Sequence, residues 1–466
     1  METLDSLKSG LASGRLAGAT SLKLCAADLT EFPTEILALA DSLTFLNLSN
    51  NCLSELPSEF AQLKKLQIAF FNNNLFETFP RVLAQCPRLS MVSFKNNRIS
   101  VIEQNSGPDS APQVLSPTLR WLILTNNRLT SLPSTIGNLT KLQKLMLAGN
   151  QLESVPSELA RCTNLELIRL SANQLESVPS ELFSLPRLAW LAYAGNPCHP
   201  TNSAIDQTLP TISSASLQQQ DVLGEGASGI IYKGLWKPAP SELDATQPIA
   251  KPKDIALKIF KGDITSDGSP LDEMQACIAA GAHPNIVSVI GKYQQADKNG
   301  LIFNFIPSDY KNLGRPPSLD TCTRDTYPED THFTVAEVLQ IATGIAAAAL
   351  HLHSRHIMHG DLYAHNILIN DAGHSILGDF GAASFYDPAV VHQSLEKIEV
   401  RAFGCLLEDL LEYCLAHGDG MESFSPEDTE ALEMLRQLQN NCMQESPANR
   451  PLFSQIANTL NSSKFS

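Results

Sequence analysis

The first half of the chain repeats a pattern of leucine and asparagine positions. From residue 43 onward the pattern LxxLxLxxNxLxxLP recurs, as in LTFLNLSNNCLSELP and LRWLILTNNRLTSLP. A fixed period of this length predicts stacked structural units, because the leucines of one unit cannot close a core alone. The asparagine position recurs every 23 residues, except for one step of 30, at Asn51, Asn74, Asn97, Asn127, Asn150, Asn173 and Asn196.

Each repeat predicts a short strand, a turn and a proline-bounded connection. Leucines at alternating positions, such as Leu46 and Leu48, are expected to face the core. The asparagine amide can satisfy backbone groups where the chain turns. The long step contains an inserted loop at residues 104–113. These features resemble the leucine-rich-repeat superfamily over roughly residues 20–198, which implies an α/β solenoid. The prolines that would fix the connections are Pro57, Pro80, Pro133, Pro156 and Pro179.

The strand positions that alternate with the leucines form an apolar stripe. We predict that this stripe binds a protein substrate or regulator, or the second domain of this chain, because contiguous exposed apolar surface usually marks an interaction site. The alternative is that these side chains pack among themselves. Its aromatic members are Phe45, Phe70, Trp121 and Trp190, and its other members are Ile68, Met91, Ile123, Met146 and Leu167.

The leucine periodicity ends after Cys198. The following segment is rich in Ser, Thr, Gln and Pro, as linkers are. We therefore predict a repeat domain at residues 1–198, a linker at 199–216 and a second domain at 217–466.

The second domain opens with three glycines between two apolar, strand-like segments, DVLGEGASGIIYKG. Glycine allows such a loop to turn sharply while its amides approach phosphate oxygens. The segment DIALKIF then places Lys258 on a short strand, where its ammonium could hold the α- and β-phosphates of ATP. The predicted nucleotide-binding residues here are Leu223, Gly224, Glu225, Gly226, Gly229, Ile231, Ala256 and Lys258.

Two further segments, IMHGDLYAHNILIND and ILGDFGAAS, have the spacing HxDxxxxN followed by DFG. Asp361 would orient an acceptor hydroxyl and accept its proton, whereas Asn366 and Asp379 offer the hard oxygen ligands that Mg²⁺ prefers. Glu273 lies on a predicted helix and could pair with Lys258, with Asp272 as the alternative. The predicted catalytic residues are therefore Asp361, Lys258 and Glu273.

Residues 217–462 resemble the eukaryotic-type protein kinases, and the whole chain resembles bacterial leucine-rich-repeat-containing protein kinases. The resemblance rests on the motifs quoted above, on a hinge-like strand LIFNFIP and on a terminal ANRPLFSQIANTL. It implies an α+β bilobal kinase fold, ATP and Mg²⁺ as cofactors, and transfer of phosphate to a protein Ser or Thr hydroxyl. It also places Phe305 in the hinge that would meet adenine. The repeats would then select a substrate or regulate the kinase domain.

The sequence departs from the kinase pattern at several positions. Gly360 stands where regulated kinases carry arginine, and no APE sequence follows DFG. Phosphorylation of an activation loop is therefore not expected to switch this domain. Tyr363 and His365 leave the choice of acceptor hydroxyl open. HGDLxxxN also occurs in aminoglycoside and choline phosphotransferases, so a small-molecule kinase and a catalytically weak ATP-binding scaffold are the alternatives.

Charge and composition restrict the binding partners and the cellular location that we expect. The net charge of −16 opposes binding to nucleic acid or anionic membranes through bulk electrostatics. The N-terminus has no signal-like apolar run, and the most apolar stretch, residues 341–352, is shorter than a bilayer-spanning helix requires. The ten cysteines form no CxxC pair. From these features we expect a cytoplasmic protein without a membrane span and with reduced thiols.

Overall fold

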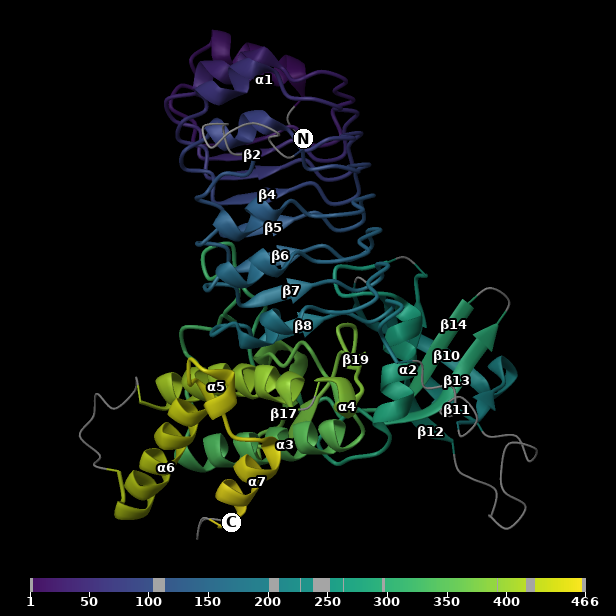
Figure 1. Cartoon of the computed structure of the whole chain (residues 1–466). Helices are drawn as coiled ribbons and strands as arrows, with labels where there is room; N and C mark the ends of the chain where they lie inside the picture. The colour runs from purple at the N-terminus through teal and green to yellow at the C-terminus, as the bar shows by residue number, and fades with distance from the viewer. Residues whose placement is uncertain are drawn as a thin grey trace. The chain divides into compact units, whose positions relative to one another are not determined.

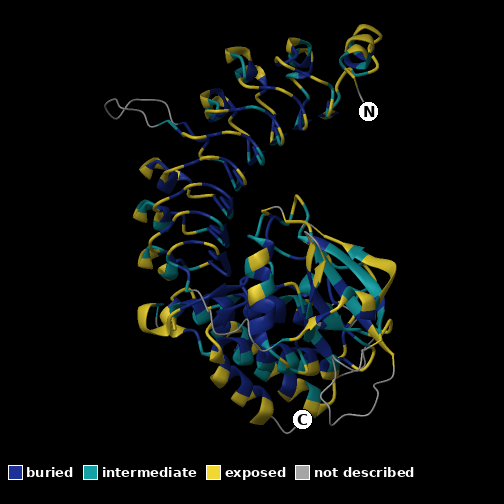
Figure 2. Ribbon diagram, turned by 90° about the vertical axis from the view of Figure 1, so that its right-hand side faces the viewer, coloured by how far each residue is buried: buried dark blue, intermediate teal, exposed yellow. Residues whose placement is uncertain are grey.

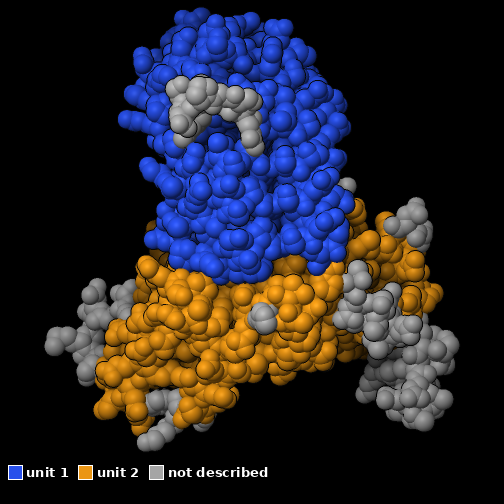
Figure 3. Space-filling view, viewed as in Figure 1, with its two compact units in different colours: residues 1–188, 196–198 blue, residues 189–195, 199–466 orange. Residues whose placement is uncertain are grey.

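The computed structural model describes residues 3–103, 114–200, 209–226, 228–237, 252–262, 264–295, 298–391, 393–415 and 424–462. They form two compact units, which Figure 3 colours separately. The first comprises Met1–Leu188 and Asn196–Cys198, and the second comprises Ala189–Gly195 and His199–Ser466. The inserted loop at 104–113 and residues 201–208 of the predicted linker lie outside the described residues. The domain boundary at residue 198 stays a prediction.

The first unit is a solenoid of parallel strands that follow one another in chain order (Figure 1). It opens with helix α1 (Leu4–Ala12), which Thr3 caps at its N-terminus. Each strand pairs in parallel with the next. The strands are β1 (Ser21–Lys23), β2 (Phe45–Asn47), β3 (Ile68–Phe70), β4 (Met91–Ser93), β5 (Trp121–Ile123), β6 (Lys144–Met146) and β7 (Leu167–Arg169).

The interior of the solenoid follows the predicted pattern. Leu46 and Leu48 are fully buried, and Figure 2 shows buried positions recurring in every repeat. The asparagines bridge neighbouring repeats: Asn74 Nδ2 donates to the carbonyl of Leu48, and Asn74 Oδ1 accepts from the amide of Leu53. The α/β solenoid is therefore confirmed. Each predicted proline directly precedes one of the 3-10 helices η2 (Ser58–Gln62), η3 (Arg81–Gln85), η4 (Ser134–Asn138), η5 (Ser157–Arg161) and η6 (Ser180–Ser184).

The apolar stripe packs partly within itself. The rings of Phe45 and Phe70 meet edge to face with centroids 5.6 Å apart. The ammonium of Lys144 lies 4.2 Å from the ring centroid of Trp121. All three rings keep part of their surface exposed, whereas Trp190 is 2% exposed and belongs to the second unit. Trp190 is therefore not exposed to a separate protein, which corrects that part of the prediction, whereas its hydrogen bond to Leu362 agrees with the alternative that the stripe contacts the second domain.

The second unit contains a six-stranded sheet in the order β10-β11-β12-β14-β13-β9. Its pairs are antiparallel except β13 with β9. Helix α2 (Pro270–Ala280) follows β12 and is capped by Ser269. The strands are β9 (Thr211–Ile212), β10 (Leu217–Glu225), β11 (Gly229–Trp236), β12 (Lys253–Phe260), β13 (Val289–Gln295) and β14 (Lys298–Asn304).

The rest of this unit is mainly helical, so the predicted α+β bilobal architecture is confirmed. Helix α5 packs on α6, and α3 packs on α7. The helices are α3 (Val335–Ser354), α4 (Pro388–Val391), α5 (Ser394–Leu415), α6 (Pro426–Cys442) and α7 (Phe453–Ser462). The short strands of this part are β15 (Lys311–Asn312), which precedes α3, and β16 (Ile357–Met358), β17 (Ile367–Ile369), β18 (Ser375–Leu377) and β19 (Ser384–Phe385), which lie between α3 and α4. Strand β8 (Trp190–Ala192) also belongs to this unit.

Helix α3 is longer than the apolar stretch that the sequence suggested. It spans 20 residues with a mean hydropathy of 1.6, which is long and apolar enough to cross a membrane by length and composition. Half of that span is buried inside the unit. The prediction that no segment is long enough for a membrane span is therefore wrong for this helix.

Candidate active site

Strands β10 and β11 form a hairpin that carries the three glycines. The amide of Gly226 donates to the carbonyl of Gly229 at 2.9 Å and closes the turn. A Cβ on Gly229 would lie 2.5 Å from the carbonyl oxygen of Ile259, so the pairing of β11 with β12 requires glycine there. A Cβ on Gly224 or Gly226 would meet no atom of the described part of the chain within 4 Å, the adjoining residues aside. The hairpin backbone at these two glycines is therefore open to a bound molecule.

Other residues predicted to bind nucleotide lie on the same sheet. Ile231 of β11 pairs with Gly224 on one side and with Lys258 of β12 on the other. Leu223 is exposed on the hairpin. Phe305 directly follows β14, and the ammonium of Lys233 lies 5.0 Å from its ring centroid.

Two of these residues have close neighbours in the sheet. Ala256 pairs with Phe303 of β14. The carboxylate of Glu225 lies 2.7 Å from the ammonium of Lys261.

The ammonium of Lys258 is in direct contact with the carboxylate of Glu273, which α2 supplies. Their side chains are 12% and 3% exposed, so the charge pair is largely removed from water. Burial alone would lower the pKa of Lys258, but the carboxylates of Glu273 and Asp379 outweigh it and the pKa is raised. Lys258 is therefore held as a cation. Asp272, the alternative partner, is half-buried, and burial raises its pKa to about 6.

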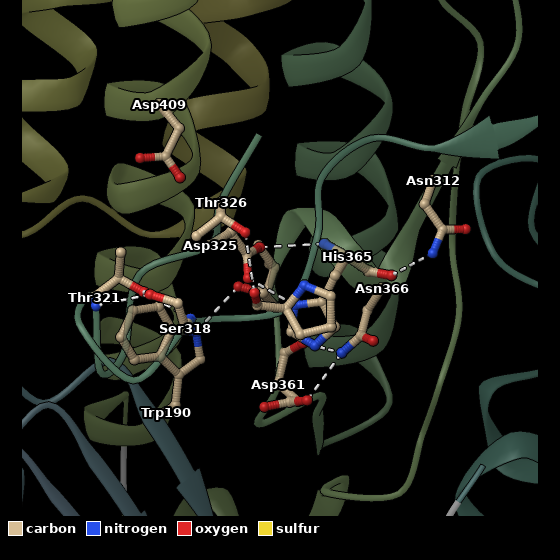
Figure 4. Close-up of polar contacts among 12 residues, drawn as sticks. Trp190, Asn312, Ser318, Thr321, Asp325, Thr326, Asp361, His365, Asn366 and Asp409 are labelled. Carbon is tan, nitrogen blue, oxygen red and sulfur yellow. Dashed lines mark hydrogen bonds and ion pairs between the residues drawn. The ribbon is translucent and has the colours of Figure 1, made fainter. Parts of the chain in front are cut away.

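Asp361 and Asn366 form a compact polar pair in the loop between β16 and β17 (Figure 4). The amide nitrogen of Asn366 donates to the backbone oxygen of Asp361 and to its carboxylate, both at 2.9 Å. Two bonds from one side chain fix the distance and orientation between these residues. Because Nδ2 is held by Asp361, Oδ1 of Asn366 is the atom left for a cation.

Asp379 lies at a strained backbone position after β18. Its φ is +51°, a left-handed conformation that a non-glycine residue rarely adopts. Its carboxylate accepts from the amide of Gly381 at 3.2 Å, and the next residue, Phe380, is buried against the His359 ring. This arrangement holds the Asp379 side chain at the surface of the unit, where it is exposed.

A buried carboxylate holds the loop that carries Asp361. Glu399 of α5 accepts from the amides of His359 and Gly360 and contacts the ring of His353 at 2.7 Å. Burial alone would raise the pKa of Glu399, but the bond to His353 and the other donors lower it. Sequence analysis missed this role, and its only available signal was an acidic residue in the first turns of a helix after DFG.

A second acid-base pair lies next to Asn366. His365 Nδ1 is 2.7 Å from a carboxylate oxygen of Asp325, whose other oxygen accepts from the His365 amide. Burial alone would lower the pKa of His365, but its bond to Asp325 and the nearby Asp361 raise it. Asp325 carried no recognisable motif, so sequence analysis did not find it. The bond to Asp325 thus favours the protonated form of the His365 ring in the loop that carries Asp361.

Comparison with known proteins agrees with this architecture. Residues 217–404 match the protein tyrosine and serine/threonine kinase family, and residues 42–63 and 117–175 match leucine-rich-repeat families. The chain therefore carries leucine-rich repeats followed by a protein kinase domain.

Three similar proteins are receptors or receptor kinases by name. The L-type lectin-domain containing receptor kinase V.7 of Arabidopsis thaliana is 28% identical over 180 residues, covering 38% of this chain and 24% of that protein. Ephrin type-B receptor 1-A of Xenopus laevis is 24% identical over 294 residues, covering 56% and 28%. Angiopoietin-1 receptor of Danio rerio is 23% identical over 304 residues, covering 57% and 26%. The chain thus spans about a quarter of the length of the curated relatives it matches.

These relatives correct two expectations. They come from a plant, a frog and a fish, so they do not support the bacterial part of the resemblance. The prediction of a cytoplasmic protein is contradicted, because the relatives are receptors or receptor kinases by name and α3 has the length and composition of a membrane span. That prediction relied on a shorter apolar stretch than the helix that forms.

Proposed function

We propose that this chain is an ATP-dependent protein kinase that transfers the γ-phosphate of ATP to a Ser or Thr hydroxyl of a protein. The observation that carries the proposal is the contact between Lys258 and Glu273. The carboxylate of Glu273 comes from another element and holds the largely buried ammonium of Lys258 in one orientation. Such a fixed cation is suited to bind phosphate. The match to the kinase family supports the class but does not distinguish Ser or Thr from Tyr as the acceptor.

The nucleotide would bind between the glycine hairpin and β12. The hairpin backbone at Gly224 and Gly226 would lie along the phosphates, because a Cβ added at either glycine would meet no atom of the described residues within 4 Å. Lys258 would hold the α- and β-phosphates. Leu223, Ile231, Ala256 and Phe305 would surround the base, following their predicted roles.

The metal ligands fit a magnesium ion that also binds phosphate. Asn366 offers an amide oxygen and Asp379 an exposed carboxylate. Among the described residues, no three His, Cys, Asp or Glu side chains gather as a metal-binding group. Two protein ligands with phosphate and water in the remaining positions are typical of Mg²⁺ in kinases. Bound Mg²⁺ would neutralise the charge that develops on the phosphoryl group.

Asp361 would act on the acceptor. Its carboxylate, oriented by Asn366, would accept a hydrogen bond from the acceptor hydroxyl and take its proton as phosphate is transferred. Glu399 would keep the loop in place by holding the amides of His359 and Gly360. Positioning and charge would supply most of the catalysis.

The repeats would bind a protein substrate or regulator. Phe45, Phe70 and Trp121 keep exposed surface on the stripe, with Lys144 beside Trp121. Aromatic side chains with an accompanying cation are common anchors in protein interfaces.

The proposal is tested with purified full-length protein, labelled ATP, Mg²⁺ and a generic protein acceptor. Wild type is expected to label protein on Ser or Thr, and Lys258→Met is expected to lose at least about 100-fold in rate. Lys298→Met, which alters an exposed lysine at the start of β14, is the matched control and should behave as wild type. Binding of ATP without any transfer to protein would reject the kinase assignment, and label on Tyr would reject the acceptor.

A further inference from the structure

Residues Ala189–Gly195 belong to the last repeat by sequence but to the kinase unit by contact. The sequence AWLAYAGN fits the repeat pattern that ends at Asn196. Among the described residues, however, this segment groups with His199–Ser466 rather than with the preceding repeats. Its strand β8 is the last strand in the order of the eight-stranded repeat sheet, and its side chains contact residues of the kinase unit.

Trp190 of β8 packs on the loop that carries Asp361 (Figure 4). Its indole stacks on the ring of Tyr363, with centroids 4.2 Å apart and planes 7° apart. Its Nε1 donates to the carbonyl of Leu362 at 3.1 Å. Leu362 and Tyr363 directly follow Asp361, so Trp190 fixes both the backbone and a side chain beside it.

Tyr363, on which Trp190 stacks, also lies next to the pair of His365 and Asp325. The ring of Tyr363 lies 5.0 Å from the ring of His365, which Asp325 holds by hydrogen bonds. Trp190, Tyr363 and His365 therefore form a row of rings along the loop. Leu362, Tyr363 and His365 lie between Asp361 and Asn366 in the sequence, so a shift of Trp190 would displace the segment that joins this pair.

Tyr193 holds a second part of the same site. Its amide donates to Ser384 Oγ at 3.1 Å, and its hydroxyl donates to the carbonyl of Phe385 at 2.8 Å. The amide of Phe385 in turn donates to His199 Nε2 at 2.8 Å. Ser384 and Phe385 form β19, which follows the DFG sequence that contains Asp379.

The backbone of β8 fills the space where a side chain of residue 360 would project. Gly360 has a φ of +73°, and a Cβ there would lie 2.6 Å from the carbonyl oxygens of Leu191 and Ala382. An arginine could not be accommodated at position 360, because the backbone of β8 occupies the space that its side chain would need. The glycine at position 360 and the β8 backbone beside it therefore both shape the loop that carries Asp361.

We propose that Ala189–Gly195 is a built-in brace for the phosphotransfer loop and that Trp190 and Tyr193 are positioning residues for the reaction. The brace holds residues 360–363 through Trp190 and β19 through Tyr193. It takes the place of support that an activation-loop phosphate would give through an arginine. The catalytic unit accordingly begins at Ala189, inside the last repeat. The expected effect of the brace on the rate of phosphate transfer rests on the proposed kinase function. Its expected effect on the order of the loop does not.

The test compares full-length wild type with Trp190→Leu, Trp190→Phe and the matched control Trp121→Leu. Trp121 has the corresponding strand position in β5 of the repeat unit. The first readout is hydrogen exchange of the amides at residues 359–366, which needs no catalysis. Trp190→Leu is expected to raise that exchange by about tenfold or more, Trp190→Phe by less, and Trp121→Leu not at all. Unchanged exchange in Trp190→Leu would overturn the brace.

The second readout is the kinetics of phosphate transfer. Trp190→Leu is expected to lower kcat by about tenfold or more, because small displacements of a catalytic group cost that much. KM for ATP should stay within about twofold. An unchanged kcat would also overturn the brace. If Trp190→Leu does not fold, Trp190→Phe, which keeps a ring but loses the Nε1 donor, decides by the same two readouts. A wild type that transfers no phosphate would contradict the proposed function, whereas hydrogen exchange would still decide the brace.

Discussion

The carboxylate of Glu399 lies 2.7 Å from the amide nitrogen of Gly360 and accepts its hydrogen bond. Glu399 is 1% exposed, so this charge is stabilised by protein donors in place of water. The same side chain accepts from the amide of His359 and contacts His353. One buried carboxylate thus ties helix α5 to the loop that carries Asp361.

Replacing Glu399 with Gln is expected to destabilise the protein by about 3 kcal/mol, because one acceptor becomes a donor facing other donors. Urea-induced unfolding measures the change. Glu430→Gln, on the exposed face of α6, is the matched control and should stay within about 0.5 kcal/mol of wild type. Equal stability of both variants would show that Glu399 is not needed by the loop.

Because the pKa of His199 is lowered in the folded protein, we expect the free energy of unfolding to decrease in mild acid. Burial lowers the pKa of His199 from 6.5 to about 4, and its ring accepts the amide of Phe385 through Nε2. Between these values the unfolded state binds more protons, so stability is present above pH 6.5 and is lost as the pH falls. The expected loss from pH 7 to pH 5 is about 2 kcal/mol.

The measurement is the free energy of unfolding at both pH values for wild type and His199→Gln. The variant should lack this part of the pH dependence, since its side chain does not titrate. His332→Gln, at an exposed position, should keep the dependence of wild type. The account fails for His199 if its variant and wild type lose stability equally.

Two glycines of the hairpin are expected to have different roles: Gly229 in stability and Gly226 in ATP binding. Gly229→Ala should cost about 2 kcal/mol, because its Cβ would collide with the backbone of β12 at Ile259. Gly226→Ala should change stability by less than about 0.5 kcal/mol, because its Cβ would meet none of the described residues within 4 Å, and it should weaken ATP binding, because that Cβ would stand where the nucleotide is proposed to bind. Thermal unfolding with and without ATP and Mg²⁺ separates the two effects. Gly226→Ala that binds ATP like wild type would contradict the proposed hairpin site.

Gly360→Ala is expected to destabilise more than Gly373→Ala, by about 2 kcal/mol. Both residues have a positive φ, so both variants carry the same kind of backbone strain. The added Cβ at residue 360 would meet two backbone carbonyls, whereas at residue 373 it would meet the flexible end of Gln340. Chemical unfolding of the two variants measures the difference. Equal losses would mean that β8 does not crowd Gly360.

Local pattern was sufficient to predict the solenoid and the site motifs. The leucine and asparagine periods determine which side chains are buried in each repeat, as at Leu46 and Asn74. The close pairing of Lys258 with Glu273 follows from a strand and a helix that are adjacent in sequence. The roles of these residues in catalysis remain proposals.

Contacts between distant segments could not be predicted in this way. The alternation of strand positions makes Trp190 equivalent to Trp121, and its contacts with Leu362 and Tyr363, 172 and 173 residues later, distinguish it. Glu399 and Asp325 have the same limitation, because neither carries a motif and each acts on a loop formed elsewhere in the chain. The full length of helix α3 was also missed, because Glu337 and Gln340 interrupt its apolar residues before the stretch at 341–352.

The most direct test of the central claim is phosphate transfer from labelled ATP to protein, compared between wild type, Asp361→Asn and Asp320→Asn. Asp320 is exposed and serves as the control of equal charge change. Wild type and Asp320→Asn are expected to transfer phosphate at equal rates, and Asp361→Asn at least about 100-fold more slowly with ATP binding retained. Equal rates in Asp361→Asn and wild type, or no transfer by wild type that binds ATP and Mg²⁺, would contradict the account.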